Sequence, residues 1–149
     1  LVTTVQDITS TGPEGYRFLK LDGGMTEILR PSLYGAQHPL VVVPENGQEK
    51  YRSPSPIKQV VVGHCCESGD LLTPAPNEPE SLAPRLLPKA EIGDFCVIES
   101  VGAYCSSMSA KNYNSFPEAA EVLKKSDGSL SVIRKRQTFE QIVENEVAP

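Results

Sequence analysis

The amino-acid sequence predicts a mainly β domain, a sandwich or a barrel, with only short helices. Two patterns support this prediction. The apolar residues fall in short segments rich in β-branched side chains, and turn signals separate these segments at intervals of about ten residues. The 149 residues are enough to bury a hydrophobic core, so we expect residues 1–149 to form one domain.

The first two segments are expected to be strands. Residues 2–9 are rich in β-branched side chains and stop at a Ser-Thr-Gly-Pro turn signal. Residues 16–21 alternate apolar and polar positions and stop at an Asp-Gly-Gly turn. One helical turn is expected at residues 25–29, because the residue before Pro31 avoids the helical conformation.

The middle of the chain combines buried strands with a proline-rich stretch. Residues 40–43 are a continuous apolar run, and a polar loop is expected at 44–56. Residues 57–63 contain three valines in a row, which is typical of a strand buried on both faces. Five prolines occur in residues 73–88. Because proline lacks a backbone donor and fixes φ, we expect no ladder there and predict a surface insertion at about 73–92.

The last third predicts a strand, a loop, a hairpin and a helix. Residues 94–101 have the composition of a strand, and the polar residues 106–116 are expected to form an ordered loop. Residues 121–124 and 130–134 flank a Ser-Asp-Gly-Ser sequence, which favours a hairpin because Asp-Gly supplies positive φ. Thr138 can then cap a short helix with its apolar residues on one side.

Charge and hydrophobicity exclude two classes of partner. The net charge is -5 and the pI is about 5.1, which argues against a nucleic-acid-binding protein, since such a protein needs a basic face. No segment approaches the roughly 20 apolar residues of a membrane helix. The chain starts at Leu1 without an initiator Met or a signal peptide, so we expect it to come from a longer polypeptide.

The four cysteines are Cys65, Cys66, Cys96 and Cys105. Two of them are adjacent and the domain is large enough to fold without disulfides, so free thiols in a reducing compartment, the cytoplasm or a plastid-like one, are expected. A metal site formed by His64 and the adjacent pair is the alternative. Spacing disfavours it, because neighbouring residues of a strand point to opposite faces and no C-x-x-C pair is present.

Three polar clusters follow the predicted strands. In the first, Arg30 and Tyr34 are four residues apart. They share a face if Pro31 starts a helical turn, and a guanidinium with a phenol would bind a carboxylate. By spacing alone, an Arg in a surface salt bridge and a Tyr in the core are favoured over this arrangement.

The second cluster follows the valine-rich strand and contains Cys66 beside Glu67. A neighbouring carboxylate disfavours the thiolate, so this thiol suits proton donation better than nucleophilic attack. A buried structural thiol is an equally weighted alternative. In the third cluster, Tyr104 follows Gly-Ala at a strand end. Its hydroxyl can reach a phosphate or a carboxylate, or the residue can be a half-buried tyrosine of the sheet.

Taken in this order, the clusters resemble the C-terminal domain of the diaminopimelate decarboxylase family, pyridoxal-phosphate enzymes of the alanine racemase-like fold type III. The matching segments are residues 21–25, 30–36, 66–70, 102–108, 112–114 and 133–136. The resemblance implies a β-sandwich or Greek-key barrel, joined in the complete enzyme to an N-terminal (β/α)8 barrel that carries the Schiff-base lysine. Since that barrel is absent here, this fragment alone is expected to be inactive.

The resemblance also implies conversion of meso-2,6-diaminopimelate to L-lysine and CO2, the last step of lysine biosynthesis, in a homodimer whose active site lies at the subunit interface. Arg30 and Tyr34 would then bind the distal carboxylate of the substrate, and Glu67 its distal ammonium. Cys66 would protonate the carbon that loses CO2. Tyr104 would contact the pyridoxal phosphate and the substrate.

Two positions depart from the family pattern. The doublet of Cys65 and Cys66 offers two thiols, of which the match before Glu67 selects Cys66. Cys105 stands where glycine is more usual, and the sequence does not explain it. Two alternatives stay open: a related decarboxylase acting on ornithine, arginine or carboxynorspermidine, for which Arg30 would have little use, and a non-catalytic dimerisation module.

Overall fold

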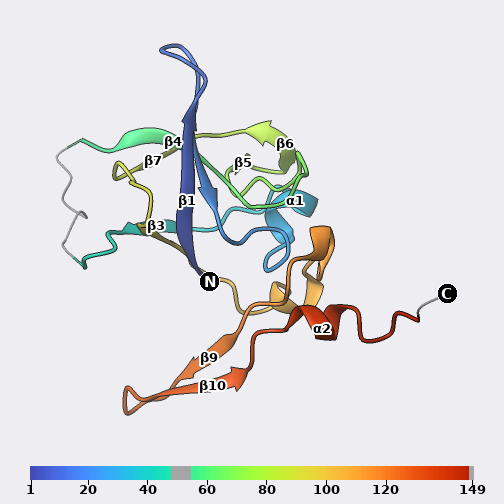
Figure 1. Cartoon of the computed structure of the whole chain (residues 1–149). Helices are drawn as coiled ribbons and strands as arrows, with labels where there is room; N and C mark the ends of the chain where they lie inside the picture. The colour runs from blue at the N-terminus through green and yellow to red at the C-terminus, as the bar shows by residue number, and fades with distance from the viewer. Residues whose placement is uncertain (48–54, 148–149) are drawn as a thin grey trace.

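The computed structural model describes residues 1–47 and 55–147. Its body is a six-stranded sheet with the strand order β3-β8-β1-β2-β4-β7 (Figure 1). The edge strands β3 and β7 approach each other, so the sheet nearly closes into a barrel, which confirms the predicted mainly β fold. The strands of this sheet are β1 (Val2–Ser10), β2 (Arg17–Leu21), β3 (Leu40–Val43), β4 (Ile57–Val62), β7 (Arg85–Leu87) and β8 (Phe95–Ile98).

The central strand β1 is shared between two neighbours. Its first residues pair with β8, Val2 opposite Val97, and its later residues pair antiparallel with β2. The register shifts between Val5 and Asp7, which marks a β-bulge. Because a bulge bends and twists a strand, it lets β1 turn the corner from one part of the sheet to the other. The pair β2–β4 is the one parallel pair among the described strands.

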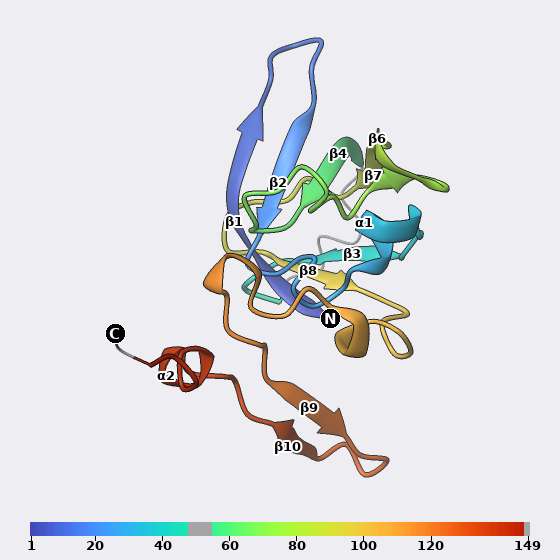
Figure 2. The same ribbon diagram turned by 90° about the vertical axis from the view of Figure 1, so that its right-hand side faces the viewer.

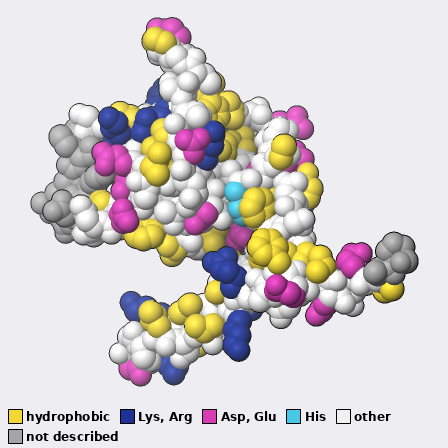
Figure 3. All heavy atoms as spheres, viewed as in Figure 1, with side chains coloured by type: hydrophobic (Ala, Val, Ile, Leu, Met, Phe, Trp, Pro, Cys, Tyr) yellow, Lys and Arg dark blue, Asp and Glu magenta, His cyan; other side chains and the backbone are white. Residues whose placement is uncertain are grey.

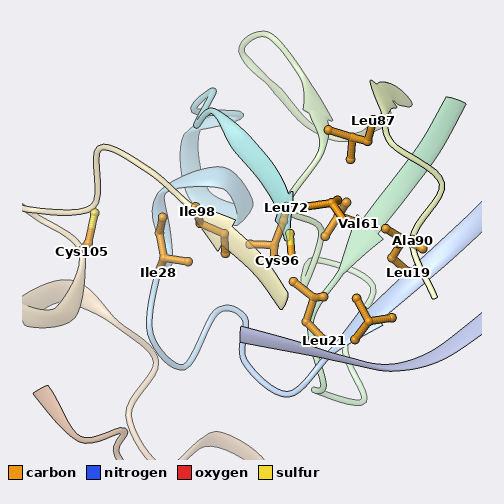
Figure 4. Close-up of a cluster of buried hydrophobic side chains, with 12 residues drawn as sticks. Leu19, Leu21, Ile28, Val61, Leu72, Leu87, Ala90, Cys96, Ile98 and Cys105 are labelled. Atoms are coloured by element: carbon orange, nitrogen blue, oxygen red, sulfur yellow. The ribbon is translucent and has the colours of Figure 1, made fainter. Parts of the chain in front are cut away.

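The core lies inside this curved sheet (Figure 4). Val60 and Val61 of β4 are both fully buried, which confirms the expectation that the valine run has no exposed face. The buried hydrophobic cluster joins all parts of the sheet and comprises Val5, Leu19, Leu21, Ile28, Val42, Val61, Leu72, Leu87, Ala90, Cys96, Ile98 and Cys105.

The prediction that no ladder crosses the proline-rich stretch is wrong. Three short strands occur there, β5 (Pro74–Ala75), β6 (Glu78–Leu82) and β7, and β7 pairs antiparallel with β4. The reason is positional. Pro84 and Pro88 flank β7 without entering it, and prolines at strand ends or on an unpaired edge remove no ladder bond. The stretch also contributes to the interior, since Thr73 and Pro74 are buried.

The helix before the second cluster begins later than predicted. Residues 25–27 form a turn, and α1 spans Arg30–Tyr34 with Pro31 in its first turn. Proline is accepted at that position because its missing N–H would have no partner within the helix. Gly35 ends the helix with a φ of 62°. Of the polar loop expected at 44–56, residues 48–54 lie outside the described part of the chain.

The C-terminal elements leave the body. The hairpin of β9 (Glu121–Lys124) and β10 (Leu130–Arg134), here called the arm, projects away from the sheet in both views (Figures 1 and 2). It forms as predicted. Short helix α2 (Phe139–Ile142) follows, and Thr138 caps it with a reciprocal bond to Gln141. No helix in the described residues is long and apolar enough to cross a membrane.

Truncation of a core residue is expected to destabilise the domain far more than truncation of an exposed one. Leu19→Ala removes a side chain with 0% exposure and should lower the free energy of unfolding by about 2–5 kcal/mol. The control Leu86→Ala removes a leucine that is 66% exposed and should change it by less than about 0.5 kcal/mol. Urea denaturation measures both. Equal losses would contradict the placement of the core.

Candidate functional site

The buried carboxylate of Asp70 joins two of the three clusters. Its Oδ1 accepts a hydrogen bond from the Met25 backbone N–H at 2.8 Å, and its Oδ2 accepts one from the Cys65 backbone N–H, also at 2.8 Å. The Gly63 N–H donates to the Asp70 carbonyl at 2.9 Å and closes the loop after β4. One side chain therefore fixes the end of β4 against the turn that leads to α1.

Two glycines make room for this carboxylate. A Cβ atom on Gly24 or on Gly63 would lie 2.2 Å from an Asp70 oxygen, well inside contact distance. The close approach of the two backbones to Asp70 therefore requires glycine at both positions. The sequence marks both glycines, but nothing in their spacing indicates that a carboxylate 46 residues after Gly24 would lie between them.

His64 provides a second connection that the sequence did not reveal. Its Nε2 lies 2.7 Å from the hydroxyl oxygen of Thr26, in the turn before α1. Its ring stacks on Phe116 with centroids 3.6 Å apart and planes 9° apart. His64 thus packs between the turn before α1 and the loop of residues 106–116. No group of three or more His, Cys, Asp or Glu that could hold a metal ion occurs within residues 1–47 and 55–147.

The two adjacent cysteines have different surroundings. Cys65 is half-buried, and the pKa of its thiol is raised to about 12. Burial is the largest cause, and the negative charge of the nearby Asp70 carboxylate adds to it. Cys66 is exposed, and its backbone N–H donates to Asn114 Oδ1 at 2.9 Å. The alternative of a buried structural thiol at Cys66 is therefore excluded. The four cysteines are all free.

Glu67 carries an oriented carboxylate. Its Oε1 accepts from the Gly69 N–H at 3.0 Å, and its Oε2 accepts from the Tyr113 hydroxyl at 3.2 Å. Both hydrogen bonds lower the pKa of Glu67, and the bond from Gly69 has the larger effect. The side chain is exposed, so an ionised carboxylate with a defined direction is presented to a ligand at the surface.

Arg30 and Tyr34 share one face of α1. The guanidinium carbon of Arg30 lies 5.7 Å from the centre of the Tyr34 ring, a cation–π distance. Tyr34 is exposed, and Arg30 forms no ion pair with a carboxylate of the described residues. The alternative of a core tyrosine beside a surface salt bridge is therefore not found.

Tyr104 lies in a turn outside the sheet. It is 65% exposed, and its φ of 58° is left-handed. The next residue, Cys105, is buried. Burial raises the pKa of the Cys105 thiol, while the positive charge of Arg30 lowers it in part. Cys105 belongs to the same buried cluster as Ile28, so the Tyr104 turn packs beside the segment that leads into α1 and Arg30 (Figure 4).

The structure thus brings the predicted residues into two groups, Arg30 with Tyr34 and the Tyr104 turn, and Cys66 with Glu67. The loop of residues 106–116 connects them. Its Ala110 N–H donates to the Met25 carbonyl at 3.0 Å, and Tyr113 and Asn114 bind the second group.

Two open cavities adjoin these groups. The larger, of about 940 Å³, lies against β1, β2 and the loop after β4, and Cys65 and Glu67 contribute to its lining together with Lys20. The smaller, of about 450 Å³, lies beside the base of the arm and is lined in part by Cys105 and Arg134. Figure 3 shows the arm below the body, with hydrophobic and basic side chains on its surface.

A methyl group on Gly24 is expected to break the Asp70 connection. Gly24→Ala would place Cβ against the carboxylate, so the free energy of unfolding should fall by about 1–3 kcal/mol, the usual result of overpacking. Gly102→Ala is the control, because a Cβ at Gly102 meets nothing within 4 Å. Thermal unfolding of the two variants provides the comparison. A Gly24→Ala variant as stable as the control would contradict the proposed close approach.

The comparisons with known proteins agree with this architecture. The family described as "Pyridoxal-dependent decarboxylase, C-terminal sheet domain" matches residues 1–102. A diaminopimelate decarboxylase of Buchnera aphidicola subsp. Baizongia pistaciae is 39% identical over 147 residues, which are 99% of this chain and 34% of that protein.

Two solved structures share the fold over nearly the whole chain. A crystal structure of diaminopimelate decarboxylase superposes with a TM-score of 0.89 at 35% identity, over 98% of this chain and 33% of that one. The Helicobacter pylori diaminopimelate decarboxylase complexed with L-lysine has a TM-score of 0.74 at 36% identity, over 98% of this chain and 31% of that one. The chain spans about a third of the length of these relatives. It belongs to the pyridoxal-dependent decarboxylases, as a C-terminal sheet domain of that family.

Proposed function

We propose that this chain supplies the substrate-binding and proton-donating part of a diaminopimelate decarboxylase, which converts meso-2,6-diaminopimelate to L-lysine and CO2. The observation that carries the proposal is the exposed thiol of Cys66 directly beside the oriented carboxylate of Glu67, in a loop fixed by Asp70. The relatives named diaminopimelate decarboxylase support it, as does the L-lysine bound to the Helicobacter pylori enzyme.

The residues of this chain fit a contact to pyridoxal phosphate, while its principal attachment would lie elsewhere. The exposed Tyr104 makes no hydrogen bond through its hydroxyl to the described residues, so that hydroxyl is available to a phosphate oxygen. The sequence has no glycine-rich phosphate loop of the G-x-x-x-x-G-K type. When bound, the cofactor withdraws electrons from the α-carbon and so stabilises the charge left by departing CO2.

Recognition of the substrate would depend on its distal end. Arg30 and Tyr34 would hold the distal carboxylate through charge-assisted hydrogen bonds, and the ionised Glu67 would pair with the distal ammonium. A shorter or singly charged amino acid would leave one of these groups unpaired, which penalises its binding.

Cys66 would act after CO2 has left. The bond between the α-carbon and the carboxylate breaks, the electron pair remains with carbon, and the Cys66 S–H delivers a proton to that carbon. Solvent then restores the proton on sulfur. Exposure of Cys66 supports this role, because the thiol must reach the substrate.

Cys66 and the other groups would need partners from outside this chain. We infer an upstream barrel that carries the cofactor lysine, and a second subunit that completes the site. The exposed apolar residues of the arm support such partners, since a two-stranded hairpin with apolar residues on both faces is not stable by itself. The exposed apolar residues of the arm are Val122, Leu123, Leu130, Val132 and Ile133. The four free thiols favour a reducing compartment, the cytoplasm or a plastid-like one.

Replacement of the proposed proton donor should abolish turnover without loss of cofactor. In the complete polypeptide, Cys66→Ala is expected to lower kcat by a factor of about 100 or more, the usual contribution of a placed acid. Absorbance of the bound cofactor should stay unchanged. Cys65→Ala is the matched control and should keep most of the activity. Full turnover by Cys66→Ala would remove Cys66 from this role.

Removal of the Arg30 guanidinium should weaken the binding only of those ligands that carry the distal carboxylate. Arg30→Ala is expected to raise the KM for diaminopimelate and the inhibition constant of L-lysine by about 10- to 100-fold, because a charged hydrogen bond is lost. The inhibition constant of 1,5-diaminopentane, which lacks that carboxylate, should not change. Equal effects on L-lysine and 1,5-diaminopentane would contradict the carboxylate-binding role.

A further inference from the structure

Residues 113–116 contact the loop after β4 at three points. The Phe116 ring stacks on His64, the Asn114 side chain accepts from the Cys66 N–H, and the Tyr113 hydroxyl donates to Glu67. We call residues 113–116 the clamp. Both residues of the second cluster are therefore bound by side chains from a segment about 48 residues further along the chain.

The backbone of this segment adopts an unusual conformation. Three non-glycine residues have left-handed φ values: Asn112 at 60°, Asn114 at 52° and Ser115 at 63°. Such angles are disfavoured for L-residues and persist where the surroundings determine the conformation, often beside functional sites. Here the left-handed backbone turns two successive side chains, Tyr113 and Asn114, toward the same loop.

The clamp is itself anchored to the base of the arm. Asn112 Nδ2 donates to the Phe116 carbonyl at 3.0 Å and also to Gln137 Oε1, and Gln137 accepts in addition from the Glu118 N–H at 3.0 Å. The clamp therefore has fixed points at both ends.

We propose that Asn114 and Tyr113 are positioning residues that set Cys66 and Glu67 for separate steps of the reaction. The inference rests on the proposed function. Asn114 binds the backbone of Cys66 and so directs the thiol, which acts only in the proton transfer. Tyr113 binds the Glu67 carboxylate and so directs the group that acts in substrate binding. Loss of the first should lower kcat, and loss of the second should raise KM.

Two substitutions at Asn114 separate its hydrogen bond from its backbone conformation. Asn114→Gly keeps the left-handed φ without strain but removes the acceptor, so kcat should fall about tenfold while KM and the unfolding temperature stay unchanged. Asn114→Asp tolerates the same φ and keeps an acceptor, so it should restore most of kcat. The rate of alkylation of Cys66 by iodoacetamide should also change in Asn114→Gly and not in Asn114→Asp.

Tyr113→Phe removes one hydroxyl and should act on Glu67. The KM for diaminopimelate should rise about threefold to tenfold at unchanged kcat, the loss of roughly one hydrogen bond. In ¹³C NMR titrations, the Glu67 carboxyl should titrate at higher pH than in the parent protein, because one cause of its lowered pKa is gone. Tyr16→Phe, in the β1–β2 hairpin, is the matched control and should change neither.

The outcomes distinguish the clamp from the proposed function. If Cys66→Ala abolishes turnover and the Asn114 and Tyr113 variants divide their effects between kcat and KM, the inference stands. If Cys66→Ala abolishes turnover but each clamp variant changes kcat and KM together, or neither variant has an effect, the positioning role of the clamp is overturned and the proposed function survives. If Cys66→Ala is fully active, the proposed function itself fails, and the alkylation and titration results still decide whether the contacts position their targets.

Discussion

The hydrogen bonds from two backbone N–H groups to the buried Asp70 carboxylate are the interaction on which the rest of the site depends. They join the end of β4 to the turn before α1, and so relate the loop of Cys66 to the helix of Arg30. A buried carboxylate is costly unless it is bonded, and Asp70 is bonded on both oxygens. The arrangement also explains why glycine is required at Gly24 and Gly63.

A scaffold held in this way lets the residues of the proposed site stay exposed. The core residues of β2 and β4 are fully buried, whereas Cys66, Glu67, Tyr34 and Tyr104 lie on turns or at element ends and face solvent. Such a division is general, because a packed sheet provides rigidity and its connecting loops provide chemistry. The loop of residues 106–116 is the element that relates the exposed groups to one another.

The sequence correctly predicted those elements whose conformation is set by a few neighbouring residues. The valine run of β4, the Asp-Gly turn of the arm and the Thr138 cap each depend on a few neighbouring residues, and the structure has all three. The proline-rich stretch was misjudged because the effect of a proline depends on which strand edge faces a partner. The contacts of Asp70, His64 and Asn114 were not predicted, because their partners lie far away in the sequence.

The pairing of β1 has a consequence for synthesis of the protein. Its neighbour β2 follows closely, but its other neighbour β8 is separated from it by about 93 residues, as the bond from the Thr3 hydroxyl to the Cys96 carbonyl illustrates. At translation rates of about 5–20 residues per second, one edge of β1 stays unpaired for roughly 5–20 seconds until β8 has been synthesised. During that interval the nascent chain presents an open strand edge to any neighbouring copy, so chaperone protection matters most before β8 emerges.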